Sequence, residues 1–188
     1  MDIKYLSEYN LISIEDFCHV SLEDRVRINS SIEKNLSIFL SEGGEFKSQG
    51  NFPLFEDDTL FFSNLYDRYK EFCYKLFGNF HIDSQNSTTC WCYRSNVNNS
   101  LHDVWHNHLY TSTINGVYYY QVEGDGIFFE RHGKEFHHIP QQGELLIFPN
   151  DLNHTPQRST SQTWRYSINM EIRTEESAST LFKNYGFS

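Results

Sequence analysis

Residues Thr163–Ile172 read TWRYSINMEI, a stretch in which apolar and polar side chains alternate without a break. Successive side chains of an extended chain point to opposite faces, so Trp164 and Tyr166 share one face. Arg165 and Ser167 share the other. The pattern predicts a strand with one buried face, whose polar face is either solvated or lines a cavity. In a cavity, Arg165 offers a planar fork of donors suited to a carboxylate.

The rest of the chain divides into a helical front and a strand-rich back. Apolar periodicity and end signals predict helices over Ser21–Leu40 and Asp58–Leu76. Strand patterns separated by turn residues follow over Cys90–Asn96, Ser112–Val122, Gly126–His132 and Glu144–Phe148. Helices before strands indicate an α+β, mainly β fold, a sandwich or barrel with the N-terminal helices packed on one face. We expect a single domain over residues 1–188, with a helical part over 1–87 and a strand core over 88–175.

Composition narrows the possible partners. The chain has 188 residues, with 15 Lys and Arg against 25 Asp and Glu, a net charge of -10. This charge argues against nucleic acid, because nucleic-acid binding depends on phosphate neutralisation by Lys and Arg. It leaves a small molecule or a protein side chain as substrate. No apolar run is long enough to span a membrane, and Met1–Asn10 does not resemble a signal peptide. The four cysteines form no CxxC pair and are interpreted as reduced core thiols of a cytoplasmic protein.

The histidines point to a metal site. His106 and His108 are two residues apart, so on extended chain both rings face the same side and can bind one ion. A third histidine, His154, follows the predicted strand Glu144–Phe148 and a Pro-Asn-Asp turn. Each feature alone is also typical of an exposed loop. The combination is more specific, because Arg165 follows His154 by eleven residues, which lets the chain turn and return along the neighbouring strand.

The motifs together resemble the 2-oxoglutarate- and Fe(II)-dependent dioxygenase superfamily. Within it, the chain is most similar to the 2OG-Fe(II) oxygenase family of short bacterial and phage proteins. The resemblance spans Cys90–Ile172, whereas the N-terminal helices agree only in general layout. It rests on His106-x-His108, Gly116-Val117-Tyr118-Tyr119, Gly143-x-Leu145-x-x-Phe148-Pro149, His154 and Arg165-x-Ser167.

The resemblance implies a fold, an activity and a set of residues. The fold is a double-stranded β-helix, or cupin-like jelly roll, whose core over residues 88–175 carries the metal. The activity is that of an oxidoreductase, a 2-oxoglutarate-dependent dioxygenase that usually hydroxylates its substrate. Fe(II) and 2-oxoglutarate are the cofactors. His106, His108 and His154 match the metal-binding and catalytic positions, Arg165 matches the residue that holds the far carboxylate of 2-oxoglutarate, and Ser167 matches the adjoining hydroxyl.

Two further residues are candidates for the co-substrate. Asn169 shares the face of Arg165 on the alternating strand. Tyr119 faces opposite to Tyr118 and Tyr120, and we assign its phenol to 2-oxoglutarate, with aromatic core packing as the alternative.

One position departs from the superfamily. Position 108 is His where the superfamily has Asp or Glu, although three imidazoles also leave open positions on Fe(II). The change leaves the metal with one more unit of positive charge. Asp103 or Glu130 is an alternative third ligand. Two other functions also stay open: a three-histidine cupin-type metalloenzyme that does not use 2-oxoglutarate, and a jelly-roll binding module without turnover.

Overall fold

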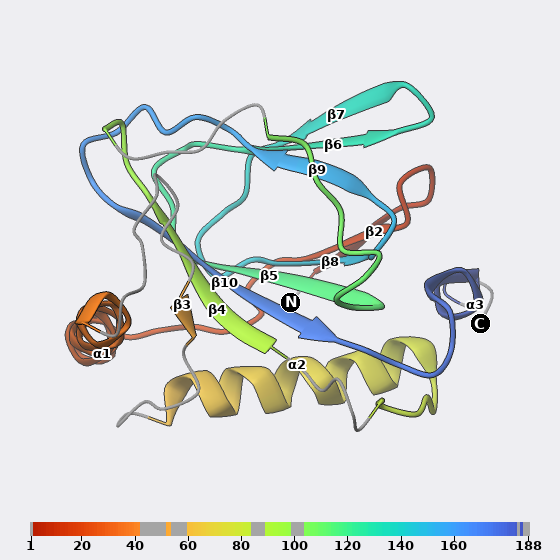
Figure 1. Ribbon diagram of the computed structural model, residues 1–188, viewed down its shortest axis with the longest axis horizontal. Coiled ribbons are helices and arrows are strands. Elements are labelled where there is room, and N and C mark those ends of the chain that lie inside the picture. Colours follow the sequence, from red (N-terminus) through yellow and green to blue (C-terminus); the bar gives the residue numbers. More distant parts are fainter. Residues whose placement is uncertain are drawn as a thin grey trace.

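Two antiparallel sheets face each other in the computed structural model, and the helices lie outside the larger sheet (Figure 1). The structure describes residues 2–41, 52–53, 60–83, 89–98, 104–183 and 185. The larger sheet has the order β1 (Ile3–Leu6), β2 (Leu11–Ile14), β8 (Leu145–Pro149), β5 (Ile114–Gln121), β10 (Arg165–Ile172), β4 (Thr89–Ser95), β3 (Phe52–Pro53). The smaller sheet has the order β7 (Lys134–His138), β6 (Ile127–Arg131), β9 (Asn153–Pro156).

The alternation along the strands separates two apolar cores. Tyr118, Tyr166 and Ile168 belong to the core between the larger sheet and the helices α1 (Leu22–Ser41), α2 (Phe61–Phe77) and α3 (Ala178–Lys183). Val117 and Tyr119, on the other face of β5, belong to a second core that includes Phe129 of the smaller sheet. The prediction that the N-terminal helices pack on one face of the sheet is therefore confirmed.

Local sequence signals explain where the helices begin and end. Ser21 caps α1, because its hydroxyl accepts a hydrogen bond from the backbone N–H of Asp24 at 3.1 Å. Gly78 ends α2 with a φ of 76°, a conformation that favours glycine. A second glycine brings α2 close to the sheet. A Cβ at Gly116 of β5 would lie 2.6 Å from the ring of Tyr69, so only glycine permits this approach.

Several elements were not predicted from the sequence. β1 and β2 lie in the part expected to be helical, and β2 pairs with β8 to extend the larger sheet. β3, β9 and α3 were also missed. All four cysteines are thiols that form no disulfide; Cys73, Cys90 and Cys92 are buried as expected, whereas Cys18 is only partly buried. Within the described residues, no helix has the length and apolar character needed to cross a membrane.

Glu144, just before β8, links β2 and β7. Its buried carboxylate lies 2.7 Å from Nε2 of His138 on β7 and accepts hydrogen bonds from the Ser13 hydroxyl at 2.7 Å and the Gln141 N–H at 2.8 Å. Burial raises the pKa of Glu144, but these hydrogen bonds outweigh burial and leave the pKa below its ordinary value of 4.5. The ionised carboxylate therefore stabilises the fold above about pH 4.5.

We expect Glu144→Gln to lower the free energy of unfolding at neutral pH by about 1–3 kcal/mol, because a buried hydrogen-bonded carboxylate is lost. In the wild type, the contribution disappears as pH falls through the lowered pKa, so the variant should lose less stability on acidification. Urea denaturation between neutral pH and pH values below 4.5 measures both effects. Parallel stability curves for the two proteins would contradict this role.

Candidate functional site

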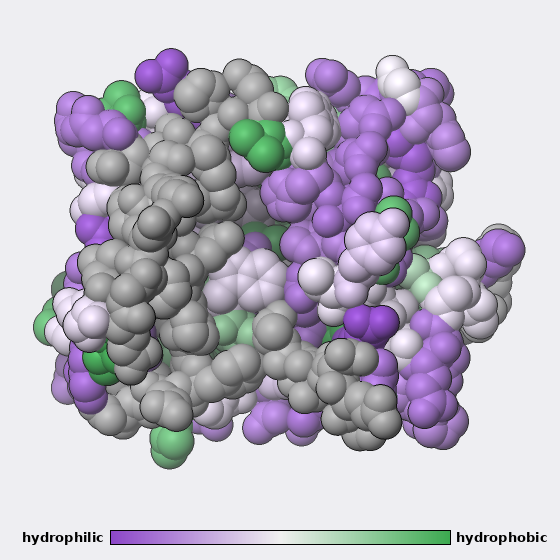
Figure 2. Space-filling model, viewed as in Figure 1, coloured by the Kyte–Doolittle hydropathy of each residue, from purple (hydrophilic) through white to green (hydrophobic). Residues whose placement is uncertain are grey.

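A cavity of about 260 Å³ opens between the two sheets. Figure 2 shows the surface hollowed near the centre of the view, over the region where β4 and β10 pass in Figure 1. Its lining combines three histidines and an arginine with aromatic and aliphatic side chains, a mixture typical of ligand sites. The lining residues are Trp91, Tyr93, Val104, His106, His108, Val117, Tyr119, Ile127, His154, Pro156, Arg165, Ser167 and Asn169.

The backbone brings the three histidines together at one end of the cavity. His154 lies on β9, and its N–H and C=O exchange hydrogen bonds with those of His106 at 2.9 and 3.0 Å. The N–H of His108 donates to the carbonyl of Asn150, in the turn before β9, at 2.8 Å. The predicted His-x-His pair therefore lies in a segment bound to the strand of the third histidine. His154 is buried, and His106 and His108 are partly buried.

Polar contacts at Nδ1 orient all three rings in the same way, through hydrogen bonds for His106 and His154 and through a close carboxylate contact for His108. Nδ1 of His106 lies 3.1 Å from the carbonyl of Val104, and Nδ1 of His154 lies 3.0 Å from the carbonyl of Leu152. A carbonyl only accepts, so both Nδ1 atoms carry a hydrogen and both Nε2 atoms present a lone pair. Nδ1 of His108 lies 2.6 Å from a carboxylate oxygen of Glu171, which leaves its Nε2 free for a ligand bond as well.

This donor set fits a divalent metal. One ligand atom from each of the three rings lies within 4.8 Å of the others, and Nε2 of His108 lies 3.3 Å from Nε2 of His154. Two nitrogens about 2.1 Å from one ion lie about 3.0 Å apart at a right angle and about 3.4 Å apart at a tetrahedral angle. A cation between the two lone pairs also removes their mutual repulsion. The cluster can therefore hold a metal ion.

Burial keeps two of these rings in the form that binds metal. Desolvation lowers the pKa of His106, and the neighbouring His108 lowers it further. Desolvation lowers the pKa of the fully enclosed His154 well below 6.5, with added repulsion from the other two rings. Both rings are therefore neutral at pH 7, as a metal ligand must be.

The structure places the carboxylate alternatives elsewhere or leaves them undescribed. Glu130, on β6, accepts hydrogen bonds from the N–H of Gly133 at 2.6 Å and the amide of Asn153 at 2.9 Å. It is not part of the three-histidine cluster. Asp103 lies outside the described residues.

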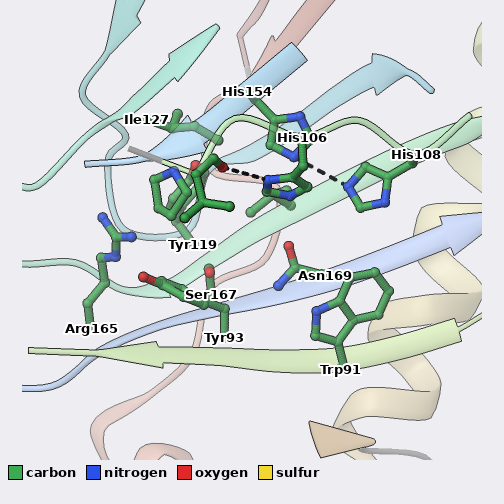
Figure 3. Close-up of a pocket in the computed structure, with 13 residues that line it drawn as sticks. Trp91, Tyr93, His106, His108, Tyr119, Ile127, His154, Arg165, Ser167 and Asn169 are labelled. Carbon is green, nitrogen blue, oxygen red and sulfur yellow. Dashed lines mark hydrogen bonds between the residues drawn. The ribbon is translucent and has the colours of Figure 1, made fainter. Parts of the chain in front are cut away.

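Arg165 lies at the opposite end of the cavity from the histidines (Figure 3). The residue is 2% exposed, and one guanidinium nitrogen donates to the carbonyl of Gly126 at 3.2 Å. Its guanidinium carbon lies 5.3 Å from the centre of the Tyr93 ring. Among the described residues, neither Nε of Arg165 nor the phenol of Tyr93 has a hydrogen-bond partner, although both atoms are buried. Buried donors without partners are rare, so these two are available for a polar ligand.

The remaining predicted residues lie between these two ends. Ser167 and Asn169 follow Arg165 on the same face of β10 and line the cavity, as does Tyr119 from β5 (Figure 3). Burial raises the pKa of the Tyr119 phenol, which therefore stays protonated and can donate a hydrogen bond at neutral pH. Apart from the alternative ligands Glu130 and Asp103, the structure thus brings the sequence-predicted site residues to one cavity.

Three residues of the site were missed in the sequence. Trp91 and Tyr93, on β4, line the cavity beside β10. Their signal was present, because Cys90 and Cys92 alternate with them and are buried on the helix side of the same strand. Glu171 was visible only as a polar residue of the alternating strand. Its contact with His108 joins residues 63 positions apart and depends on tertiary structure.

Comparison with solved structures identifies the fold. The chain is similar to a prolyl-4-hydroxylase of Pseudomonas putida, with a TM-score of 0.55 and 12% identity over 89% of this chain and 94% of the other. It is similar to an oxidoreductase of the 2OG-Fe(II) oxygenase family from Burkholderia pseudomallei, with a TM-score of 0.56 and 11% identity over 92% and 89% of the chains. HygX of Streptomyces hygroscopicus, solved with nickel and 2-oxoglutarate bound, gives a TM-score of 0.59 and 10% identity over 91% and 85%.

The sequence matches no protein-family model and no curated protein. At these low identities, the structural neighbours establish the fold alone. The chain has the double-stranded β-helix fold of the 2OG-Fe(II) oxygenases, as the sequence motifs predicted.

Proposed function

We propose that this protein is a 2-oxoglutarate- and Fe(II)-dependent oxygenase that hydroxylates its substrate. One observation carries the proposal: a three-histidine cluster and a buried arginine with an unsatisfied donor line opposite ends of one small cavity. The first end suits a cation and the second suits a carboxylate, and 2-oxoglutarate has a metal-chelating end and a free carboxylate end.

His106, His108 and His154 would hold the iron on one side and leave its cavity side open. When bound, Fe(II) and 2-oxoglutarate supply oxidative chemistry with O₂, in which 2-oxoglutarate becomes succinate and CO₂ while a substrate C–H bond becomes C–OH. Hydrogen bonds from Nδ1 of two of the rings to the carbonyls of Val104 and Leu152 would keep their Nε2 atoms directed at the ion. The Glu171 carboxylate against Nδ1 of His108 would do the same for the third ring.

Arg165 would bind the far carboxylate of 2-oxoglutarate. Its guanidinium lies where water has little access, so a charge-assisted pair formed there is stronger than one in water. The Ser167 hydroxyl and the Tyr93 phenol lie on neighbouring strands and can donate to the same carboxylate. Tyr119 and Asn169 also line the cavity and would contact the middle of the co-substrate.

The substrate would be a small molecule or a protein side chain. The net charge of -10 argues against a nucleic acid. One structural neighbour is a prolyl hydroxylase in complex with a peptide fragment, and another is the carbocyclase SnoK from nogalamycin biosynthesis, so this fold serves both kinds of substrate. Four cysteines without a disulfide support a cytoplasmic location, where thiols stay reduced.

A second candidate function is that of a three-histidine metalloenzyme that does not use 2-oxoglutarate. The presence of His108 in place of a carboxylate favours it, because three neutral ligands are also found outside the 2-oxoglutarate enzymes. The buried Arg165 favours the oxygenase, since a metalloenzyme without 2-oxoglutarate does not require a cation at the far end of the cavity.

Succinate formation distinguishes the candidates. The Fe(II)-loaded protein, incubated in air with 2-oxoglutarate and ascorbate, should form succinate slowly even without its substrate. Omitting iron, or replacing 2-oxoglutarate by glutarate, should abolish the product. A protein that binds iron and forms no succinate, even when offered a panel of amino acids and peptides, would favour the three-histidine enzyme or a binding module.

A further inference from the structure

Glu171 is a buried carboxylate directly behind one of the three histidines. It lies on β10, two residues beyond Asn169 and on the same face, and is 5% exposed. One of its oxygens lies 2.6 Å from Nδ1 of His108 and 3.2 Å from the hydroxyl of Thr111. A buried carboxylate is costly unless it is paired, so its place against the His108 ring needs a physical reason.

The three rings differ in what lies behind them. In the described part of the chain, Nδ1 of His106 and Nδ1 of His154 face backbone carbonyls, which carry no net charge. Nδ1 of His108 faces a carboxylate. His108 is also the position where the 2-His-1-carboxylate face of non-haem iron enzymes has a charged ligand. The negative charge of Glu171 therefore lies behind His108, the ring that stands where those enzymes have a carboxylate ligand.

The net charge around a bound ion also suggests that Glu171 replaces the missing carboxylate ligand. Two histidines and a carboxylate ligand contribute one negative charge to a bound ion. Three neutral histidines contribute none, but three histidines together with Glu171 again contribute one. A carboxylate against the far ring nitrogen also makes an imidazole a stronger electron donor to a metal, and Glu171 lies 2.6 Å from that nitrogen of His108.

We propose that Glu171 is a positioning residue that holds Nε2 of His108 toward the metal and supplies, through that ring, the negative charge of the missing carboxylate ligand. This inference rests on the proposed function, because it requires a metal at the three histidines. It assigns Glu171 no contact with the ion or the substrate.

The test is the affinity for Co(II), measured by competition with a coloured chelator. Glu171→Gln keeps a side-chain oxygen that can face Nδ1 of His108 but removes the charge, so its Co(II) affinity should fall by about 10- to 100-fold. Glu171→Asp keeps the charge at a greater distance and should lie between this variant and the wild type. Glu144→Gln, the matched control, removes a buried carboxylate that also contacts a histidine, and should bind Co(II) as the wild type does.

The reduction potential distinguishes the loss of the Glu171 charge from a loosening of the His108 ring. In the wild type, the negative charge of Glu171 stabilises Fe(III) more than Fe(II). With iron bound, the potential of the Fe(III)/Fe(II) couple should therefore rise in Glu171→Gln, which lacks this charge. A variant that only loosened the His108 ring would weaken affinity without this directed shift. Unchanged affinity and potential in Glu171→Gln would overturn the role of Glu171 and leave the proposed function intact.

Two other outcomes also overturn the role. If Glu171→Gln loses Co(II) as completely as His108→Ala, then Glu171 is itself a ligand. If the wild type binds no Co(II), then both the proposed function and this inference fail. Should the Glu171 variants not fold, nitrogen-15 NMR of the histidine rings in zinc-loaded wild type decides the matter. The proposal requires His108 to keep its hydrogen on Nδ1 and bind zinc through Nε2, and the reverse arrangement would contradict it.

Discussion

His154→Ala should lose its bound metal almost entirely while keeping its fold. His154 is the enclosed member of the cluster, and its Nε2 lies 3.3 Å from that of His108, so its removal leaves two partly exposed rings. The loss of affinity should exceed the roughly 10- to 100-fold cost of removing an outer partner of a metal ligand. Metal content after loading with Fe(II) or Co(II) and desalting, with circular dichroism to check the fold, measures the effect.

A matched control uses another histidine. His132 is exposed in the turn between β6 and β7 and has a φ of 55°, which asparagine tolerates well, so His132→Asn should retain the metal. Glu130→Ala and Asp103→Ala should also retain it, because we assign the third ligand to His108. Full metal content in His154→Ala, or loss of metal in either carboxylate variant, would contradict the assignment.

Arg165→Ala should weaken 2-oxoglutarate binding by roughly 10- to 100-fold. The guanidinium is buried at the far end of the cavity, and a charge-assisted hydrogen-bonded pair contributes about 1.5–3 kcal/mol, at tenfold per 1.4 kcal/mol. Arg165→Lys should recover only part of the affinity, because an ammonium cannot form the bidentate contact. Isothermal titration of the Ni(II)-loaded proteins with 2-oxoglutarate measures the change.

The metal content of the two Arg165 variants serves as a control. Arg165 lies at the opposite end of the cavity from the histidines, so both substitutions should leave metal content unchanged. Glutarate, which lacks the keto group, should bind the wild type more weakly than 2-oxoglutarate does. Equal 2-oxoglutarate affinity in wild type and Arg165→Ala would mean that Arg165 is a structural residue.

The alternating strand was the most predictive part of the sequence. In β10, apolar residues such as Tyr166 and Ile168 do pack against the helix side, and Arg165, Ser167 and Asn169 do line the cavity. Strict alternation is informative because a shift of one residue would place every polar side chain in the apolar core.

Short elements were missed because they carry too little pattern. β2 has four residues, all buried, so it shows no alternation. β9 reads NHTP and forms because β6 pairs with it, although its composition is typical of a turn. Both depend on partners distant in the chain, which local propensity does not contain.

The sequence predicted which histidines lie together but not what surrounds them. The spacing of His106 and His108 predicted a shared face, and the structure confirms that their rings meet His154. The groups that contact Nδ1 of these rings depend on how the loop with His106 and His108 packs against β9 and β10. Glu171 and Tyr93 belong to this second set, and for Tyr93 the alternation with Cys90 and Cys92 was an available signal.

Anaerobic titration of the Fe(II)-loaded protein with 2-oxoglutarate tests the central claim most directly. Chelation of Fe(II) by the keto acid produces a visible charge-transfer absorption band, so the measurement reports metal and co-substrate in the same site. We expect the wild type to develop the band saturably, Arg165→Ala to require roughly 10- to 100-fold more 2-oxoglutarate, and His154→Ala to show no band. A wild type that retains Fe(II) but shows no band at millimolar 2-oxoglutarate would contradict the account.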